Sequence, residues 1–138
     1  MNRDMAEIIR NQKPVCMAPN ATLREACAVM HDKRVGAILV TDPIGRLVGI
    51  MTGRDIVRCA GAGADLDTTR IEQAMTRDPD TMPPRSTAIE ALRLMRDGGF
   101  RHVPVVEHGR PVGIVSRGDF RGLEHDRMDV ETGLWERI

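Results

Sequence analysis

Two short stretches of the sequence decide its fold: GIMTGRD at residues 49–55 and GIVSRGD at residues 113–119. Both have a glycine, two apolar residues, a hydroxyl residue, two variable residues and an aspartate. A single copy of this pattern is weak evidence, because many strand-to-helix turns satisfy it. Its occurrence twice, 64 residues apart, indicates an internal repeat.

The repeat extends over most of the 138 residues. The copies align at a shift of 65 residues before the turn at 42–44, where one residue drops out, and at a shift of 64 after it. The identical pairs are Pro14 with Pro79, Met17 with Met82, Thr22 with Thr87, Glu25 with Glu90, Ala26 with Ala91, Met30 with Met95, Asp32 with Asp97, Val40 with Val105, Gly45-Arg46 with Gly109-Arg110, Val48-Gly49-Ile50 with Val112-Gly113-Ile114, and Asp55 with Asp119. So many identities in one register predict a tandem duplication, here called copy one and copy two.

Each copy carries the signals of a strand, helix, strand, strand, helix order. A hydroxyl residue three positions before a glutamate starts a helical pattern in both copies, at Thr22 and at Thr87. Apolar runs then predict a hairpin in each copy, at 37–40 with 47–51 and at 103–106 with 111–115. A weaker first strand is expected near 15–17 and 81–82, and a last helix near Asp55 and Asp119.

The predicted fold is a mixed α/β module of two half-domains. One copy alone has too few strands to be stable, so the two are expected to pack sheet to sheet about a pseudo-twofold axis. The expected organisation is motif one at 1–60 with its N-terminal segment, a linker at 61–70 containing the flexible Gly61-Ala62-Gly63-Ala64, motif two at 71–122, and a tail at 123–138. Leu134-Trp135 is the only pair of adjacent apolar residues in that tail.

Composition argues against several classes of function. With 20 basic and 20 acidic side chains, no Tyr, two Phe and one Trp, a nucleic-acid partner is not expected. No apolar run is long enough for a membrane span, and a signal peptide is not expected, because the first residues lack an apolar core. Cys16, Cys27 and Cys59 lack Cys-x-x-Cys spacing, which favours a reducing, cytoplasmic setting. The four histidines, His31, His102, His108 and His125, are scattered, so no metal site is expected.

Each copy resembles a CBS motif, named after the cystathionine β-synthase regulatory domain, and the pair resembles a Bateman module. The resemblance covers residues 5–122 and rests on the capped helix, the apolar-Pro-Val segment at 103–105 and the two stretches quoted first. Copy one departs from the family at Leu39, where a proline is frequent.

The resemblance implies a non-catalytic regulatory module that needs no other cofactor. It implies an adenosyl ligand, namely AMP, ADP, ATP, NAD(H) or adenosylmethionine, in a cleft between the two motifs, with adenine nucleotides expected first. Such a module acts as an energy or metabolite sensor, on itself or on a partner protein, and a homodimer is expected.

The aspartates of the two quoted stretches are the expected ribose ligands. A carboxylate at Asp55 or Asp119 can accept hydrogen bonds from both ribose hydroxyls, and Thr52 and Ser116 present a hydroxyl toward ribose or phosphate. The following helix N-terminus favours an anion, while Gly49 and Gly113 let the backbone approach closely. The same residues also suit helix capping, and the two roles can coexist.

Further candidates would meet the phosphate and the base. Arg54 and Arg117 are either phosphate ligands or solvated surface residues. Val35, Ile50 and Ile114 form either a flat slot for adenine or ordinary core. The full set of candidate ligand-binding residues is Val35, Gly36, Ala37, Ile50, Thr52, Arg54, Asp55, Arg101, His102, Pro104, Ile114, Ser116, Arg117 and Asp119.

By resemblance, Arg101 and His102 line the cleft, and copy one has Gly36-Ala37 at the matching positions. We hypothesise that Arg101 and His102 reach across to the Asp55 site, which then favours phosphorylated ligands. The Asp119 site, with Ser116, Val35, Gly36 and Ala37, would be weaker or would prefer a less charged ligand.

Two other classes of function stay open. One is a ligand-free interaction or scaffold module whose clefts are filled by side chains, and a missing thermal shift with adenine compounds would favour it. The other is a small hydrolase or transferase acting on a nucleotide, and turnover by the purified protein would favour that.

Overall fold

The computed structural model describes residues 3–120 and divides the chain into two compact units. One unit, called the first-repeat unit, consists of residues 13–79 and 108–111. The other, called the second-repeat unit, consists of residues 1–12, 80–107 and 112–138, of which 3–12, 80–107 and 112–120 are described. The segment before residue 13 therefore groups with copy two, and residues 61–79 group with copy one. The domain boundaries expected from the sequence stay a prediction.

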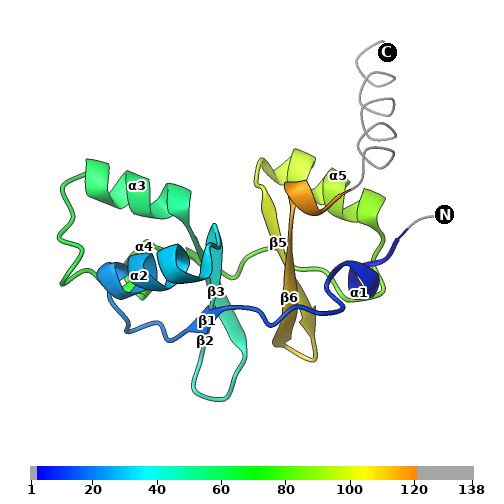
Figure 1. Ribbon diagram of the computed structural model, residues 1–138, viewed down its shortest axis with the longest axis horizontal. Helices are drawn as coiled ribbons and strands as arrows, with labels where there is room; N and C mark the ends of the chain where they lie inside the picture. Colours follow the sequence, from blue (N-terminus) through cyan, green and yellow to red (C-terminus); the bar gives the residue numbers. More distant parts are fainter. Residues whose placement is uncertain (1–2, 121–138) are drawn as a thin grey trace, which may run out of the picture. The chain divides into compact units, whose positions relative to one another are not determined.

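The first-repeat unit has the predicted order of elements, with two additions (Figure 1). The elements are β1 (Cys16–Met17), α2 (Leu23–Lys33), β2 (Ala37–Thr41), β3 (Leu47–Thr52), α3 (Gly53–Gly61), α4 (Ile71–Ala74) and β4 (Thr76–Arg77). The four strands form one sheet in the order β1-β2-β3-β4. β1 pairs with β2 in parallel, whereas the other two pairings are antiparallel. The helix α4 and the strand β4 were not expected from the sequence.

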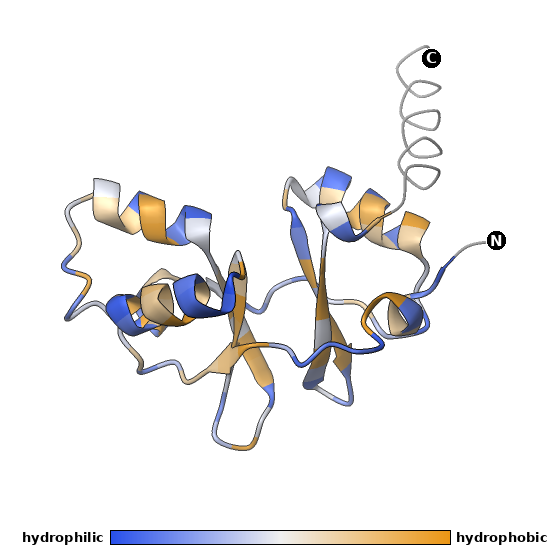
Figure 2. Cartoon of the chain, in the orientation of Figure 1, coloured by the Kyte–Doolittle hydropathy of each residue, from blue (hydrophilic) through white to orange (hydrophobic). Residues whose placement is uncertain are grey.

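One face of this sheet packs against the helices. Ile38 and Val40 of β2 and Met51 of β3 belong to a core cluster. Helices α2 and α4 complete the cluster with Leu23, Ala26, Met30, Ile71 and Ala74. Because side chains alternate along a strand, the residues between these core positions lie on the opposite face. Figure 2 shows hydrophobic residues concentrated on β2 and β3. Helix α2 carries both hydrophobic and hydrophilic residues, as expected for a helix with one buried side.

The main helix of each unit begins and ends as the sequence predicts. In α2 the Thr22 hydroxyl accepts a hydrogen bond from the Glu25 N–H at 3.1 Å. The helix stops at Arg34, whose φ of 54° lies in the left-handed region. The matching helix α5 (Ala88–Gly98) has the same cap at Thr87 and stops at Gly99, with φ of 69°. Equal caps at equal positions confirm the repeat at the level of local structure.

The second-repeat unit contains α1 (Met5–Ile8), α5, β5 (His102–Glu107), β6 (Arg110–Ser116) from residue 112 onward, and a 3₁₀ turn, η1 (Arg117–Asp119). β5 and β6 form a two-stranded sheet joined by a tight turn. The weak strand expected at 81–82 is a single parallel bridge from Met82 to Val105. The last helix expected from Asp119 is described only as η1, and the predicted tail with Leu134-Trp135 lies outside the described residues. The mixed α/β class is confirmed.

The core of the second-repeat unit uses the same alternation. Val103 and Val105 of β5 and Val115 of β6 face a cluster built mainly from α5. No pattern in the sequence predicted α1, yet Met5 and Ile9 from this N-terminal segment are buried in that cluster.

Gly49 and Gly113, the first residues of the two quoted stretches, lie where other segments of the chain pack closely against the strands. A Cβ at Gly113 would lie 2.7 Å from the Cβ of Ile9, and a Cβ at Gly49 would meet Met75, with Cγ at 3.0 Å. The expectation that these glycines let the backbone approach a ligand closely stays a prediction. The groups that approach them within the chain are the side chains of Ile9 and Met75, which follow α1 and α4, and the Thr76 carbonyl oxygen, 3.0 Å from a Cβ at Gly49.

We predict that Gly113→Ala destabilises the protein by about 1–3 kcal/mol, since the new methyl group overpacks against the base of the Ile9 side chain. Urea unfolding followed by circular dichroism measures the change. Gly61→Ala is the matched control, because nothing lies within 4 Å of its Cβ position. Equal stability of the two variants would contradict the packing role of Gly113.

Candidate functional site

The strand residues among the candidates share one face in each unit, the face opposite the helices. In the first-repeat sheet, Ala37 pairs with Thr52, and Ile50 pairs with Leu39. These positions alternate with the core residues Ile38 and Met51. Ala37, Ile50 and Thr52 therefore lie on one surface of the sheet, at the end where α3 begins.

The second-repeat unit repeats this arrangement. His102 and Pro104 alternate with Val103 and Val105 along β5, and Ile114 and Ser116 flank Val115 along β6. All four candidates therefore lie on the face that does not meet α5. The candidate residues that belong to strands thus lie on corresponding faces of the two sheets.

The turn after β3 is closed by a carboxylate. Oδ2 of Asp55 accepts hydrogen bonds from the Thr52 N–H at 2.9 Å and from the Thr52 hydroxyl at 3.0 Å. Oδ1 of Asp55 pairs with Nη2 of Arg58 at 3.3 Å. The side chain of Asp55 is 14% exposed, against 64% for Arg58. The capping role considered from the sequence is therefore present, and both carboxylate oxygens have partners within the chain.

In the turn after β6, the carboxylate of Asp119 accepts the same two hydrogen bonds, but only one of its oxygens takes part. Oδ2 of Asp119 accepts from the Ser116 N–H at 2.7 Å and from its hydroxyl at 3.3 Å. Within residues 3–120, Oδ1 of Asp119 has no hydrogen-bond or ion-pair partner, and the residue is exposed. A ribose hydroxyl could bind this oxygen without breaking the cap.

The helix N-terminus expected at both turns is described at one of them. α3 is a nine-residue helix whose first turn follows Thr52, whereas copy two is described only as far as the short η1. In α3 the Gly53 N–H donates to the Gly36 carbonyl at 3.1 Å, and the Asp55 N–H donates to the Thr52 hydroxyl at 3.3 Å. Part of this anion-binding end is thus already satisfied internally.

Cationic residues lie beside the turn of copy two within its own unit. The Arg117 N–H donates to the Arg101 carbonyl at 3.1 Å, which brings the start of β5 next to the Asp119 turn. Burial lowers the pKa of His102, the Asp119 carboxylate acts in the opposite direction, and Arg101 adds to the lowering. Arg54 in copy one and Arg117 are both exposed. That Arg101 and His102 serve the Asp55 site, as hypothesised from the sequence, stays a prediction.

The three residues expected at the base differ in their surroundings. Val35 packs against the core of the first-repeat unit, which favours the ordinary-core alternative for this residue. Ile50 and Ile114 lie on the faces opposite the two cores. Ile50 is buried, at 7% exposure, whereas Ile114 is half-buried, so Ile114 is the better placed of the two to meet a flat ligand.

Two residues near the turns were not expected from the sequence. Arg58 follows Asp55 by three positions, a helical spacing that could have suggested the ion pair. Gln12 forms two hydrogen bonds with the backbone of Ile114, and no local pattern in the sequence indicates such a long-range contact.

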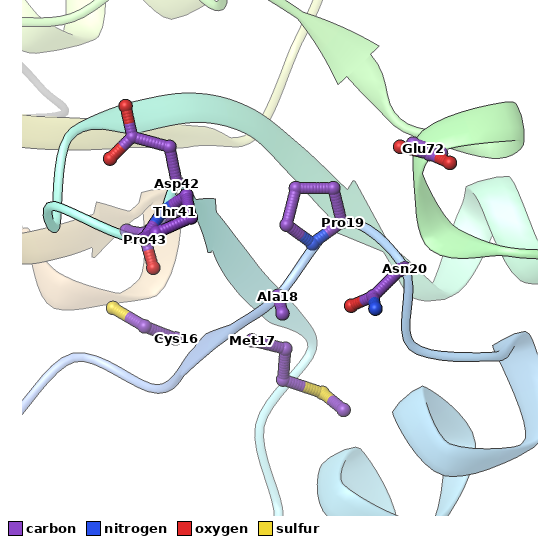
Figure 3. Close-up of a pocket in the computed structure, with 9 residues that line it drawn as sticks. All are labelled: Cys16, Met17, Ala18, Pro19, Asn20, Thr41, Asp42, Pro43 and Glu72. Carbon is purple, nitrogen blue, oxygen red and sulfur yellow. The ribbon is translucent and has the colours of Figure 1, made fainter.

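The first-repeat unit also has a separate surface hollow (Figure 3). Its volume is about 580 Å³, and none of the candidate residues lines it. The lining residues are Cys16, Met17, Ala18, Pro19, Asn20, Thr41, Asp42, Pro43 and Glu72.

Among residues 3–120, no group of three or more His, Cys, Asp or Glu side chains is arranged to hold a metal ion. The same residues include no helix with the length and hydrophobicity needed to cross a membrane.

Comparisons with known proteins agree with this geometry. The family model for the CBS domain matches residues 5–61 and 71–126. An uncharacterised 17.7 kDa protein of Acidianus ambivalens is 36% identical over 125 residues, which are 90% of this chain and 73% of that protein. The chain spans about 20% of the length of a related CBS domain-containing protein of Arabidopsis thaliana.

Two solved structures are similar over nearly the whole chain. The CBS domain protein PAE2072 from Pyrobaculum aerophilum, complexed with AMP, has a TM-score of 0.83 and 27% identity, covering 92% of this chain and 98% of that one. The CBS domain pair of protein MJ0100, in complex with 5′-methylthioadenosine and S-adenosyl-L-methionine, has a TM-score of 0.82 and 25% identity, covering 92% and 99%. With two matched CBS domains and one strand–helix–strand–strand plan in both copies, this chain belongs to the CBS domain family.

Proposed function

We propose that this protein is a regulatory module that binds an adenosyl ligand, most directly an adenine nucleotide, at its Thr/Ser-x-x-Asp turns. The observation that carries the proposal is the open Oδ1 of Asp119, held on an exposed turn by the two bonds from Ser116. The similar proteins solved with AMP and with S-adenosyl-L-methionine support an adenosyl ligand for this chain.

The proposed chemistry begins with the ribose. An ionised carboxylate is an acceptor only, which suits the paired hydroxyls of ribose. Asp119 can accept at Oδ1 while Oδ2 keeps the turn closed. Asp55 can do so only by sharing Oδ1 with Arg58, which makes binding at the two turns unequal.

Phosphate recognition would come from cations near these turns. Arg101 precedes β5 and His102 begins it, next to the Asp119 turn, whereas Gly36 and Ala37 take the same position next to the Asp55 turn. A guanidinium pairs well with phosphate oxygens, so Arg101 is the strongest candidate to separate AMP, ADP or ATP from uncharged adenosine.

Regulation would follow from a difference in affinity between two conformational states, since only such a difference shifts a population. We expect no catalytic step, and we expect the protein to work in the cytoplasm as a homodimer, on itself or on a partner protein. These expectations rest on the family's general behaviour.

We predict that removing the open carboxylate oxygen of copy two weakens ligand binding. Asp119→Asn keeps an oxygen for Ser116 but replaces the second acceptor with a donor, so Kd for both AMP and adenosine should rise about tenfold or more. Isothermal titration calorimetry measures both ligands. Asp32→Ala, an exposed aspartate on α2, is the control and should bind as the wild type does. Binding unchanged in both Asp119→Asn and Asp55→Asn would show that these aspartates only cap their turns.

We also predict that Arg101→Ala weakens AMP binding and spares adenosine. Combining it with Asp55→Asn and with Asp119→Asn in double-mutant cycles shows which turn Arg101 serves. The sequence hypothesis predicts energetic coupling between Arg101 and Asp55. Equal losses for AMP and adenosine in Arg101→Ala would contradict a phosphate contact.

The lowered pKa of His102 gives a pH-dependent prediction. In the free protein, the unfolded state binds a proton at His102 more readily, so the free energy of unfolding should fall as the pH drops below about 6.5. A bound phosphate would favour the protonated imidazole, so AMP binding near pH 6.5 should take up a proton and adenosine binding should not.

Calorimetry in two buffers of different ionisation enthalpy measures the uptake. His102→Gln should remove it, whereas His31→Gln, an exposed control, should retain it. Equal proton uptake in wild type and His102→Gln would contradict the phosphate contact.

A further inference from the structure

Gln12 imitates a strand neighbour of β6. Its Nε2 donates to the carbonyl oxygen of Ile114 at 2.8 Å, and the Ile114 N–H donates to its Oε1 at 2.8 Å. Two residues that exchange both backbone bonds are the unit of an antiparallel ladder, and here a side-chain carboxamide takes the place of one of them. The contact joins residues 102 positions apart and is partly buried.

Copy one closes the same edge in a different way. Ile50, which matches Ile114 in the repeat, lies opposite Thr76 of β4 in a backbone ladder. Gly49 beside it lies opposite Arg77. Releasing Ile50 requires a strand to detach, whereas releasing Ile114 requires only rotation of one side chain, which is a fast local motion. The edge of β6 is therefore the more easily opened of the two.

The edge that Gln12 covers matches the hydrogen-bonding edge of adenine. A carboxamide presents an acceptor and a donor side by side. Adenine presents the same pair on its Watson–Crick edge, with N1 as the acceptor and the N6 amino group as the donor. The N–H and C=O of Ile114 could therefore bind either group, but not both at once.

The position of this edge relative to the ribose anchor also fits. Ile114 precedes Ser116 by two residues on the same strand, and Ser116 holds Asp119. The segment that carries Gln12 is fixed nearby, because Ile9 fills the space beside Gly113 and Arg3 donates to the Asp119 carbonyl at 3.0 Å. Base edge and ribose anchor thus belong to one continuous stretch of six residues, 114–119.

We propose that the Gln12 carboxamide is an internal competitor for the nucleobase: adenine pairs with the backbone of Ile114 only when Gln12 has left it. This rests on the proposed function and adds a residue that sets affinity in copy two alone. Displacing Gln12 costs the two partly buried hydrogen bonds of the free protein, and the ligand replaces them. Gln12 therefore lowers affinity without touching the bound ligand.

The test compares AMP and adenosine binding in wild type, Gln12→Ala and the neighbouring control Asn11→Ala, whose side chain is exposed. Without the competitor, Kd for both ligands should fall about tenfold in Gln12→Ala, and Asn11→Ala should match wild type. Because Gln12 competes with the base and Asp119 holds the ribose, adding Asp119→Asn should raise Kd by a similar factor in wild type and in Gln12→Ala. Gln12→Glu, which cannot donate to the Ile114 carbonyl, should also bind more tightly and serves if the alanine variant does not fold.

A nuclear magnetic resonance measurement on the wild type tests the exchange of partners directly. At saturating AMP, the Gln12 side-chain amide protons should lose their protection from solvent while the Ile114 amide keeps its own. Binding by wild type with unchanged Kd in both Gln12 variants, or a Gln12 amide still protected at saturation, would overturn the inference alone. No binding by wild type or by either variant would overturn the proposed function as well.

Discussion

The carboxylate that closes each strand-to-helix turn is the interaction on which the rest of the site depends. In both copies, Oδ2 of the aspartate accepts the N–H of the hydroxyl residue three positions earlier, at 2.9 Å for Asp55 and 2.7 Å for Asp119. This bond orients the second oxygen, and what that oxygen meets differs between the copies. Arg58 occupies it in copy one, and it is open in copy two among the described residues.

The alternation of side chains along the strands divides the residues between two faces. One face of each sheet packs against the helices and the other carries the candidate residues, of which Ala37 and Ile50 are themselves buried. Gly49 and Gly113 are positions at which the chain packs closely against itself. Their missing side chains admit Met75 and Ile9, which pack the segments after α4 and α1 against β3 and β6.

Much of this was predictable from local sequence. The caps at Thr22 and Thr87, the hairpins and the two Asp turns follow from spacing, and the duplication strengthened each of them. The short elements α1, α4 and β4 were not predictable, because four or fewer residues carry no periodicity. The Gln12–Ile114 pair depends on a contact across 102 positions, which only the folded chain shows. The close packing at the two glycines could not be predicted for the same reason, since their neighbours come from other segments of the chain.

The two copies share a plan but differ in how freely a ligand can reach each turn. The central claim is that the aspartate whose carboxylate accepts the hydrogen bonds that close its turn also accepts hydrogen bonds from the ribose hydroxyls. A crystal structure of the protein grown with saturating AMP tests it most directly. The account predicts ribose hydroxyls within hydrogen-bonding distance of Asp119, Asp55 or both. AMP bound elsewhere, such as in the hollow between Pro19 and Glu72, with both carboxylates engaged only in their turns, would contradict it.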